Sequence, residues 1–302
     1  MSHHRSIVSP LLCACILFCL LGQTGCGVGF NMGPRTKVTR SINVPHQPGA
    51  INVTGRNGSI TFKVDASQSD VTISAELTAG GSTQKEADER AQASAVEVTH
   101  GENGTMSISA AFPAPQHERD AARFVIVVPS VDGVTLTTSN GAVTLTGSSG
   151  TAEITTRNGA IVVKDHTGDA TVRTSNGNIT ASDVTGSATL VTSNGRITMS
   201  GITGSIDATT SNGRIVADAV ESAGPVNLTS TNGSLSITLG PNFEGPISAV
   251  TTNGRITFAD NAKRATSVDS QSRRLHAQIG TGGAPSTFRT SNSSVTITIS
   301  PE

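Results

Sequence analysis

The sequence contains no tryptophan and no tyrosine, and it has only 8 phenylalanines among 302 residues. Aromatic side chains normally help to fill the wide interior of a compact enzyme. Their scarcity therefore predicts a thin core built from Val, Ile, Leu and Ala. Charge is scarce as well, since charged residues make up 14% of the chain and the formal net charge is −1. Nucleic-acid binding requires a basic excess, so we expect no nucleic-acid partner.

Cysteine is confined to the amino-terminal leader. Arg5 precedes an apolar run over residues 11–21, whose length is typical of a signal peptide rather than of a membrane span. The run ends in Leu-Gly-Gln-Thr-Gly-Cys, which resembles a bacterial lipobox except that Gln23 stands where Leu is usual. We therefore expect residues 1–26 to be a signal peptide of the lipoprotein type, with lipid on Cys26.

The leader also predicts where the protein acts. The cysteines are Cys13, Cys15, Cys19 and Cys26, so a chain that starts at Cys26 has no thiol left for a disulfide or a cysteine metal cluster. We expect an exported protein of the bacterial cell envelope, in the outer membrane or periplasm, that touches the membrane only through its lipid anchor. Residues 27–45 begin with Gly-Val-Gly and are predicted to be a tether.

Asn-Gly dipeptides recur at a nearly fixed interval. The first five are 18 residues apart, and the next two intervals are 20 and 21 residues. Their asparagines are Asn140, Asn158, Asn176, Asn194, Asn212, Asn232 and Asn253. Apolar residues predominate four and six positions before each asparagine and three and five positions after it, with Thr, Ser and occasional charges between them. Each repeat thus holds two stretches of period-2 alternation, which predicts two short strands and excludes a helix.

Two architectures fit this pattern. Asn-Gly is the strongest short-range signal for a β-hairpin, so one architecture is a chain of antiparallel hairpins. In the other, each repeat is one coil of a β-solenoid and equivalent positions stack about 4.8 Å apart. We favour the solenoid because it brings every Asn-Gly to one edge, where the amide side chains form a hydrogen-bonded ladder. We expect the glycine to supply a positive φ at this corner.

The prediction for the carboxyl-terminal part is an all-β fold. Residues 131–300 are expected to form a single-stranded β-solenoid with coils of about 18 residues, wound right-handed as most such solenoids are. Phe288 lies in a further copy of the repeat and is expected to seal the end of the solenoid. Residues 260–284 are expected to form a degenerate coil with a loop.

The amino-terminal part, residues 46–130, is predicted to be β-rich with one short helix. Residues 51–62 are another copy of the repeat, built around the Asn-Gly pair that begins at Asn57. The helix is expected near residues 83–95, because Thr83 and Glu86 have the spacing of a capping box.

This layout resembles a known family. An exported leader, an early strand pair around Asn-Gly, a helix of the Gln-Lys-Glu-Ala-Asp-Glu type and repeats of the form Leu-x-Thr-Ser-Asn-Gly-x-Ile-x-Leu are similar to the bacterial putative-adhesin β-strand-repeat family. The resemblance covers about residues 46–300. It implies a β-solenoid of the cell envelope and supplies no catalytic residues.

Two sets of charged residues are candidate sites. Asp165 and Asp183 occupy equivalent positions of adjacent repeats, where two carboxylates bind Ca²⁺ or act on a sugar, or where Asp simply favours a turn. We favour the turn. Arg196, Arg214 and Arg255 each follow an Asn-Gly pair, and stacked guanidinium groups are suited to a carboxylate or phosphate ligand.

The functional prediction is a non-catalytic module, an adhesin or scaffold that binds an envelope glycan or a surface protein along its flat face. The alternative is a polysaccharide-acting lyase or hydrolase of the β-helix type. Such enzymes need long loops that frame a groove, and an 18-residue coil is consumed by its strands and corners. We therefore expect no enzymatic activity, no metal and no cofactor.

Overall fold

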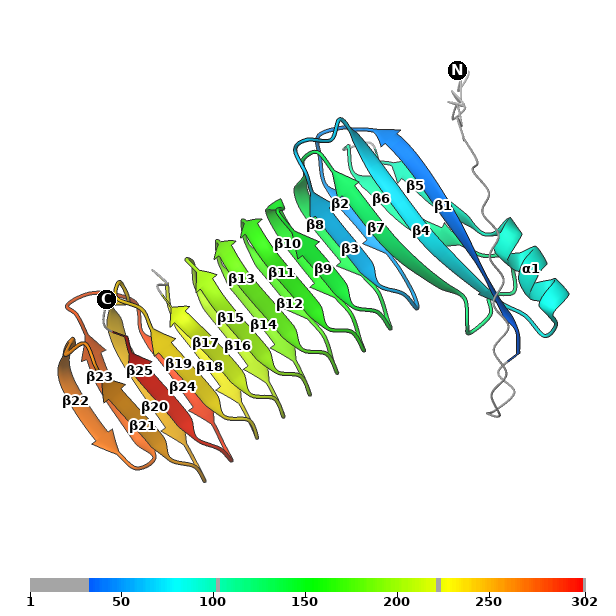
Figure 1. Ribbon diagram of the computed structural model, residues 1–302. Coiled ribbons are helices and arrows are strands. Elements are labelled where there is room, and N and C mark those ends of the chain that lie inside the picture. Colours follow the sequence, from blue (N-terminus) through cyan, green and yellow to red (C-terminus); the bar gives the residue numbers. More distant parts are fainter. Residues whose placement is uncertain (1–32, 102–103, 221–223, 301–302) are drawn as a thin grey trace, which may run out of the picture.

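The computed structural model describes residues 33–101, 104–220 and 224–300. In these ranges the chain is all-β, with 25 strands in one continuous sheet and one helix. Figure 1 shows a long row of parallel rungs with the helix at one end of the row. The predicted signal peptide, its Cys26 and the start of the predicted tether lie outside the described residues.

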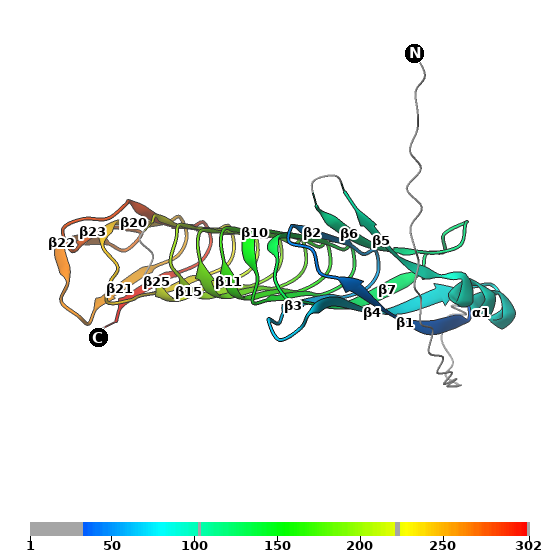
Figure 2. The ribbon, with the colours of Figure 1, turned by 90° about the horizontal axis from the view of Figure 1, so that it is seen from above.

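The repeat region is solenoid-like. Each coil contributes one strand to each of two faces, which enclose the core between them when the molecule is seen from above (Figure 2). The first face contains β8 (Asp132–Thr137), β10 (Ser149–Thr155), β12 (Ala170–Arg173), β14 (Ala188–Thr192), β16 (Ile206–Thr210) and β18 (Val226–Ser230). The second face contains β9 (Val143–Thr146), β11 (Ile161–Thr167), β13 (Ile179–Thr185), β15 (Ile197–Ile202), β17 (Ile215–Val220) and β19 (Leu235–Leu239).

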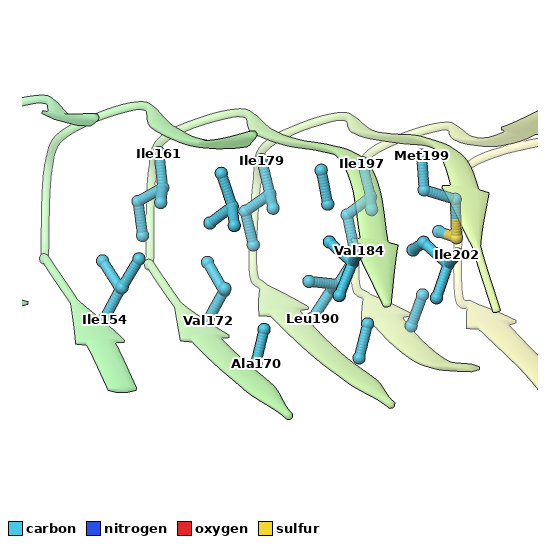
Figure 3. Packing of buried hydrophobic residues seen from close by; sticks show 14 of the residues in the cluster. Ile154, Ile161, Ala170, Val172, Ile179, Val184, Leu190, Ile197, Met199 and Ile202 are labelled. Atoms are coloured by element: carbon cyan, nitrogen blue, oxygen red, sulfur yellow. The ribbon is translucent and has the colours of Figure 1, made fainter. Parts of the chain in front are cut away.

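The strands of each face are parallel, which excludes the chain of hairpins. Ile161 is opposite Ile179, Ile179 is opposite Ile197, and Ile197 is opposite Ile215. The same column of side chains points inward in every coil, and these four isoleucines have 0% exposure. Figure 3 shows this interior as a layer of aliphatic side chains from the two faces. The scarcity of aromatic residues is a consequence of this thin core.

The carboxyl-terminal coil is inserted between two earlier coils. It consists of β24 (Ser286–Thr290) and β25 (Val295–Ile299). β24 pairs with β18 on one side and with β20 (Gly245–Thr251) on the other, while β25 lies between β19 and β21 (Ile256–Asp260). Phe288 therefore lies inside the solenoid, and the prediction that it seals the end was wrong.

A hairpin covers that end instead. β22 (Ala265–Gln271) and β23 (Arg274–Ile279) are antiparallel to each other, and β23 also pairs antiparallel with β20. The prediction of a degenerate coil over 260–284 was therefore wrong. An antiparallel partner interrupts the stacking of parallel coils, so this hairpin ends the solenoid.

The amino-terminal end shows the same kind of reordering. β2 (Ile51–Thr54) and β3 (Ile60–Val64) pair with β8 and β9 on one side. On the other side they pair with β6 (Met106–Ala111) and β7 (Ala121–Val128), which come later in the chain. β5 (Ala95–His100) is antiparallel to β6, and β4 (Asp70–Gly80) is antiparallel to β7.

Part of the predicted tether is a strand. β1 (Arg35–Pro45) pairs antiparallel with the whole length of β4. Val38, Ile42 and Val44 alternate along β1 and pack against the core. The tether prediction was therefore wrong for residues 35–45.

The helix predicted near 83–95 is α1 (Gln84–Ala93), which packs on β1 and β4. Thr83 caps it, because its hydroxyl accepts the backbone N–H of Glu86. A buried ion pair anchors the other end: the Arg90 guanidinium lies 2.7 Å from the Asp120 carboxylate. This contact ties the helix to the segment that leads into β7.

Candidate binding surfaces

One edge of the solenoid is an asparagine ladder. In each coil the Asn side-chain amide donates to the side-chain carbonyl of the Asn in the neighbouring coil, over 2.6–2.8 Å. The ladder runs through Asn57, Asn140, Asn158, Asn176, Asn194, Asn212, Asn232, Asn292 and Asn253. It contains all seven predicted asparagines, with Asn292 between Asn232 and Asn253. The ladder therefore follows the order of the coils in space and not their order in the chain.

A second ladder lies behind it. Two positions before every ladder asparagine except Asn57 stands a buried Thr or Ser whose hydroxyl donates to a backbone carbonyl of the preceding coil. Thr192, for example, donates to the Gly177 carbonyl over 3.0 Å and accepts the Gly195 N–H over 3.2 Å. Sequence reasoning missed these residues. Their signal was the recurrence of Thr or Ser at one fixed place before Asn-Gly.

The corner glycines are required by close approach and not by backbone conformation. Gly177 and Gly195 are absent from the glycines with positive φ, so the expected positive φ was wrong. A Cβ at Gly195 would lie 1.7 Å from the Gly177 carbonyl oxygen. Any side chain here would separate neighbouring coils, which explains why glycine recurs.

The two candidate aspartates lie close to the second corner of the coil, where β11 leads into β12 and β13 into β14. Their backbones have the left-handed conformation. Asp165 has φ 52° and Asp183 has φ 55°, and glycines occupy the same position in the flanking coils, Gly147 with φ 75° and Gly201 with φ 61°. Gly and Asp are among the residues that best tolerate this conformation. Both carboxylates are exposed, and no three His, Cys, Asp or Glu side chains of the described ranges are arranged to hold a metal ion. A structural role in the turn accounts for both residues.

The three candidate arginines are exposed, and two of them are neighbours. The coils of Arg196 and Arg214 are adjacent, because the Ile197 N–H donates to the Arg214 carbonyl. Arg255 is three coils away from Arg214, with Ser234 and Ser294 between them. The stack therefore contains Arg196 and Arg214, and Arg255 stands apart.

His166 is a buried histidine of the repeat region. It occupies an inward column of β11, opposite Val184, and is 1% exposed. Its Nδ1 lies 2.8 Å from the Ser148 hydroxyl, while Nε2 has no hydrogen-bond partner within the described residues. Burial lowers the pKa of His166 below its ordinary value. The side chain is therefore a core residue that is neutral at pH 7.

The surface is hollowed near the second corner. An open groove of about 510 Å³ is lined by the glycines of that corner together with the acidic side chains of Asp132, Glu153 and Asp169. Because glycines form its floor, the backbone is bare there. Along the rest of the repeat region the faces carry short outward side chains, mainly Thr and Ser on β9, β13, β15 and β19.

Residues 96–298 match the family model described as Toastrack DUF4097. The chain belongs to this family. The match runs from β5 to β25, so the Toastrack region contains all the coils except the early one formed by β2 and β3. The family comprises β-repeat proteins of unknown function, and several solved structures similar to this chain are described as putative adhesins.

Solved structures similar to the Toastrack chain include proteins from Bacteroides and Parabacteroides. A putative adhesin from Bacteroides fragilis is 12% identical, with a TM-score of 0.46, and the match covers 88% of this chain and 97% of that one. A putative lipid binding protein from Parabacteroides distasonis is 14% identical, with a TM-score of 0.40 and coverage of 87% and 96%. A putative adhesin from Parabacteroides merdae is 11% identical, with a TM-score of 0.31 and coverage of 89% and 98%.

No curated protein matches the chain. Over residues 33–101, 104–220 and 224–300, the structure has no helix of the length and apolar character that a membrane crossing requires.

Proposed function

We propose that this protein is a non-catalytic adhesin or scaffold of the bacterial cell envelope, which binds glycan or protein along its second face. The observation that carries the proposal is the flatness of that face. Coils stacked in register place equivalent short side chains in straight rows, and a flat surface is suited to extended contacts with a polymer or with another protein. Pocket-binding ligands need concave sites that bury most of their surface.

One outward row of the second face carries no charge and supplies hydroxyl groups at most of its positions. The outward position next to the first inward residue of each strand is occupied by Thr, Ser or Val in every coil. These residues are Thr61, Thr144, Val162, Thr180, Thr198, Val216, Ser236, Thr296 and Thr257. Hydroxyl groups both donate and accept hydrogen bonds, so they match the hydroxyl groups of a glycan. With a spacing of about 4.8 Å between coils, the row extends for about 38 Å.

Two carboxylates with lowered pKa values belong to structural turns. The pKa of Glu86 is lowered chiefly because its carboxylate accepts the Ser82 N–H at the start of α1. The pKa of Asp260 is lowered by backbone N–H groups of the turn that follows β21, against the opposing effect of burial. Each of these shifts arises from a local structural contact. The alternative function, a lyase or hydrolase acting on polysaccharide, remains the second candidate because β-solenoids with longer coils can build a catalytic groove.

The proposal includes the location and the winding. An exported, lipid-anchored protein of the outer membrane or periplasm would present its solenoid to envelope glycans, and lipid on Cys26 is part of this proposal. We also propose that each coil is about 18 residues long, which the register of the central strands supports, and that the coils wind right-handed.

The test is a glycan and envelope-polymer binding array, run beside a lyase assay on uronate polymers. Thr180→Glu with Thr198→Glu places two carboxylates on the second face and should abolish binding. The matched control, Thr171→Glu with Thr189→Glu, alters the first face at adjacent coils and should leave binding intact.

Two results would overturn the proposal. One is turnover of a uronate polymer that Asp165→Ala or Asp183→Ala removes, which would make the protein an enzyme. The other is equal loss of binding in both pairs of Thr variants, which would show that the second face has no special part in recognition.

A further inference from the structure

The two long edges of the solenoid carry charges of opposite sign. In the coils of Asn158 to Asn212, each coil has one arginine within three residues of its ladder asparagine, and no acidic residue there. We call these exposed arginines the basic edge: Arg157, Arg173, Arg196 and Arg214. We call the exposed carboxylates at the other ends of the same strands and in the second corner the acidic edge: Glu153, Asp165, Asp169, Asp183, Asp207 and Asp218.

The two edges do not neutralise each other within one molecule. Along one strand the arginines and carboxylates are four or more residues apart, while across neighbouring strands Arg173 is opposite Thr155, two residues from Glu153. In the part of the chain that the structure describes, none of the four arginines forms an ion pair. Asp165, which lies 3.9 Å from Lys164, is the one acid of the acidic edge that does. Both edges are therefore available to an external partner.

The acidic edge is also concave where it begins. The open groove of about 510 Å³ lies over the bare backbone of Gly133, Gly150 and Gly168, and Glu153 and Asp169 stand at its wall. The opposite edge carries the four long, exposed arginine side chains. A guanidinium group donates to carboxylates in a planar fork, so such side chains fit a groove with acidic walls.

We propose that a second copy of this chain docks side by side with the first, with its basic edge against the acidic edge. Both edges belong to the coils from Asn158 to Asn212 and share one spacing of about 4.8 Å, so two copies with parallel axes bring the charges into register without any shift along the axis. The carboxylate ligand expected for Arg196 and Arg214 is thus supplied by the second copy. This inference is independent of the glycan-binding face.

Symmetry decides the form of the assembly. A two-fold dimer would place an edge against the same edge of its partner and would bring like charges together. A sideways translation pairs unlike edges and leaves one basic and one acidic edge free at the two ends of the row. Such a heterologous contact does not close, so it builds open rows of solenoids.

An acidic polysaccharide is the competing occupant of the basic edge. It would explain the four arginines, but not why six carboxylates gather on the opposite edge of the same coils. A second copy explains both edges at once, and we therefore favour it.

The first experiment measures the mass of the purified protein by sedimentation velocity over a range of concentrations. Near 10 mM NaCl, where charges interact over about 30 Å, the average mass should rise with concentration. Near 1 M NaCl, where the screening length is about 3 Å, the protein should be a monomer. A monomer at every concentration and both salt levels would overturn the proposal.

The second experiment uses variants that retain only one edge. In the basic-edge variant the basic edge is removed by Arg157→Gln, Arg173→Gln, Arg196→Gln and Arg214→Gln. In the acidic-edge variant the acidic edge is removed by Glu153→Gln, Asp165→Asn, Asp169→Asn, Asp183→Asn, Asp207→Asn and Asp218→Asn, and Asn tolerates the left-handed conformation at the second corner. The matched control removes four cations elsewhere, with Lys37→Gln, Lys85→Gln, Arg273→Gln and Arg274→Gln.

Each edge variant alone should remain a monomer at low salt, and the control should associate like the unaltered protein. An equimolar mixture of the two edge variants should form a 1:1 dimer and nothing larger, because each supplies the edge that the other lacks. The proposal is overturned if the mixture stays monomeric or if the basic-edge variant still associates by itself. It is also overturned if polygalacturonate binds the unaltered protein through the four arginines while no self-association occurs.

Discussion

The substitution Thr192→Val tests the hidden hydroxyl ladder most sharply. Thr192 is 2% exposed, and its hydroxyl both donates to the Gly177 carbonyl and accepts the Gly195 N–H. Valine has nearly the same shape but makes neither bond, so both backbone groups lose this partner inside the corner. An unsatisfied buried polar group costs about 1–3 kcal/mol, so we expect the free energy of unfolding to fall by about 2–5 kcal/mol.

Two control variants isolate the hydrogen bonds. Thr192→Ser keeps the hydroxyl and loses one methyl group, and the chain itself has Ser230 in this column, so the loss should be about 1 kcal/mol. Thr198→Val lies on the outward row that already contains Val216, so stability should stay within about 0.5 kcal/mol. The assay is equilibrium urea unfolding, combined with hydrogen exchange of the Gly195 amide. Equal stabilities of Thr192→Val and Thr192→Ser would refute the reasoning.

Four further predictions follow from the same structure. Ile197→Asn should lower the free energy of unfolding by about 3–5 kcal/mol, measured by urea unfolding, because it buries an amide without a partner. Arg90→Met should cost about 3–5 kcal/mol in the same assay, and adding Asp120→Asn should recover part of the loss, since the single variant leaves a buried carboxylate unpaired. Because burial lowers the pKa of His166, the unfolded state takes up its proton first as the pH falls below about 6.5. Stability should therefore decrease between about pH 7 and pH 5, and thermal melts should show a smaller decrease for His166→Val. Cys26→Ala should release the protein from the membrane fraction on immunoblots, and unchanged membrane retention would refute the lipid anchor.

The strand register of the repeat region could be predicted because residues at the same position of successive repeats pair with one another. The isoleucine three positions after each asparagine is inward in every central coil, and the asparagine itself is always at the corner. A period that is exact over four intervals leaves one stacking register for these coils. The solenoid-like fold and the ladder edge followed from that.

The order of the coils at the two ends could not be predicted from the same columns. Val295 of the last coil pairs with Leu235 on one side and with Ile256 on the other, and either neighbour offers the same kind of aliphatic surface. When coils are interchangeable in packing, their sequence does not determine which two are adjacent. The length of the connections and the hairpin β22–β23 decide it.

The tether prediction failed for a specific physical reason. β1 alternates Val38, Ile42 and Val44 with polar residues, which is a strand pattern, whereas the glycines at 27 and 29 are typical of a tether. His166 stands eight positions after its asparagine, in the same inward column as Val184 and Ile202, so its position in the repeat accounts for its burial.

The central claim is that binding is spread along the second face, and changing the number of coils tests it most directly. Deleting residues 170–187 removes one 18-residue repeat and joins Asp169 to Ala188, which takes the register position of Ala170. The affinity for the longest glycan bound on the array should fall by a similar factor for each coil removed, while a glycan that spans only two coils should bind as before. Unchanged affinity until one particular coil is deleted, followed by complete loss, would contradict the claim and locate a single site instead.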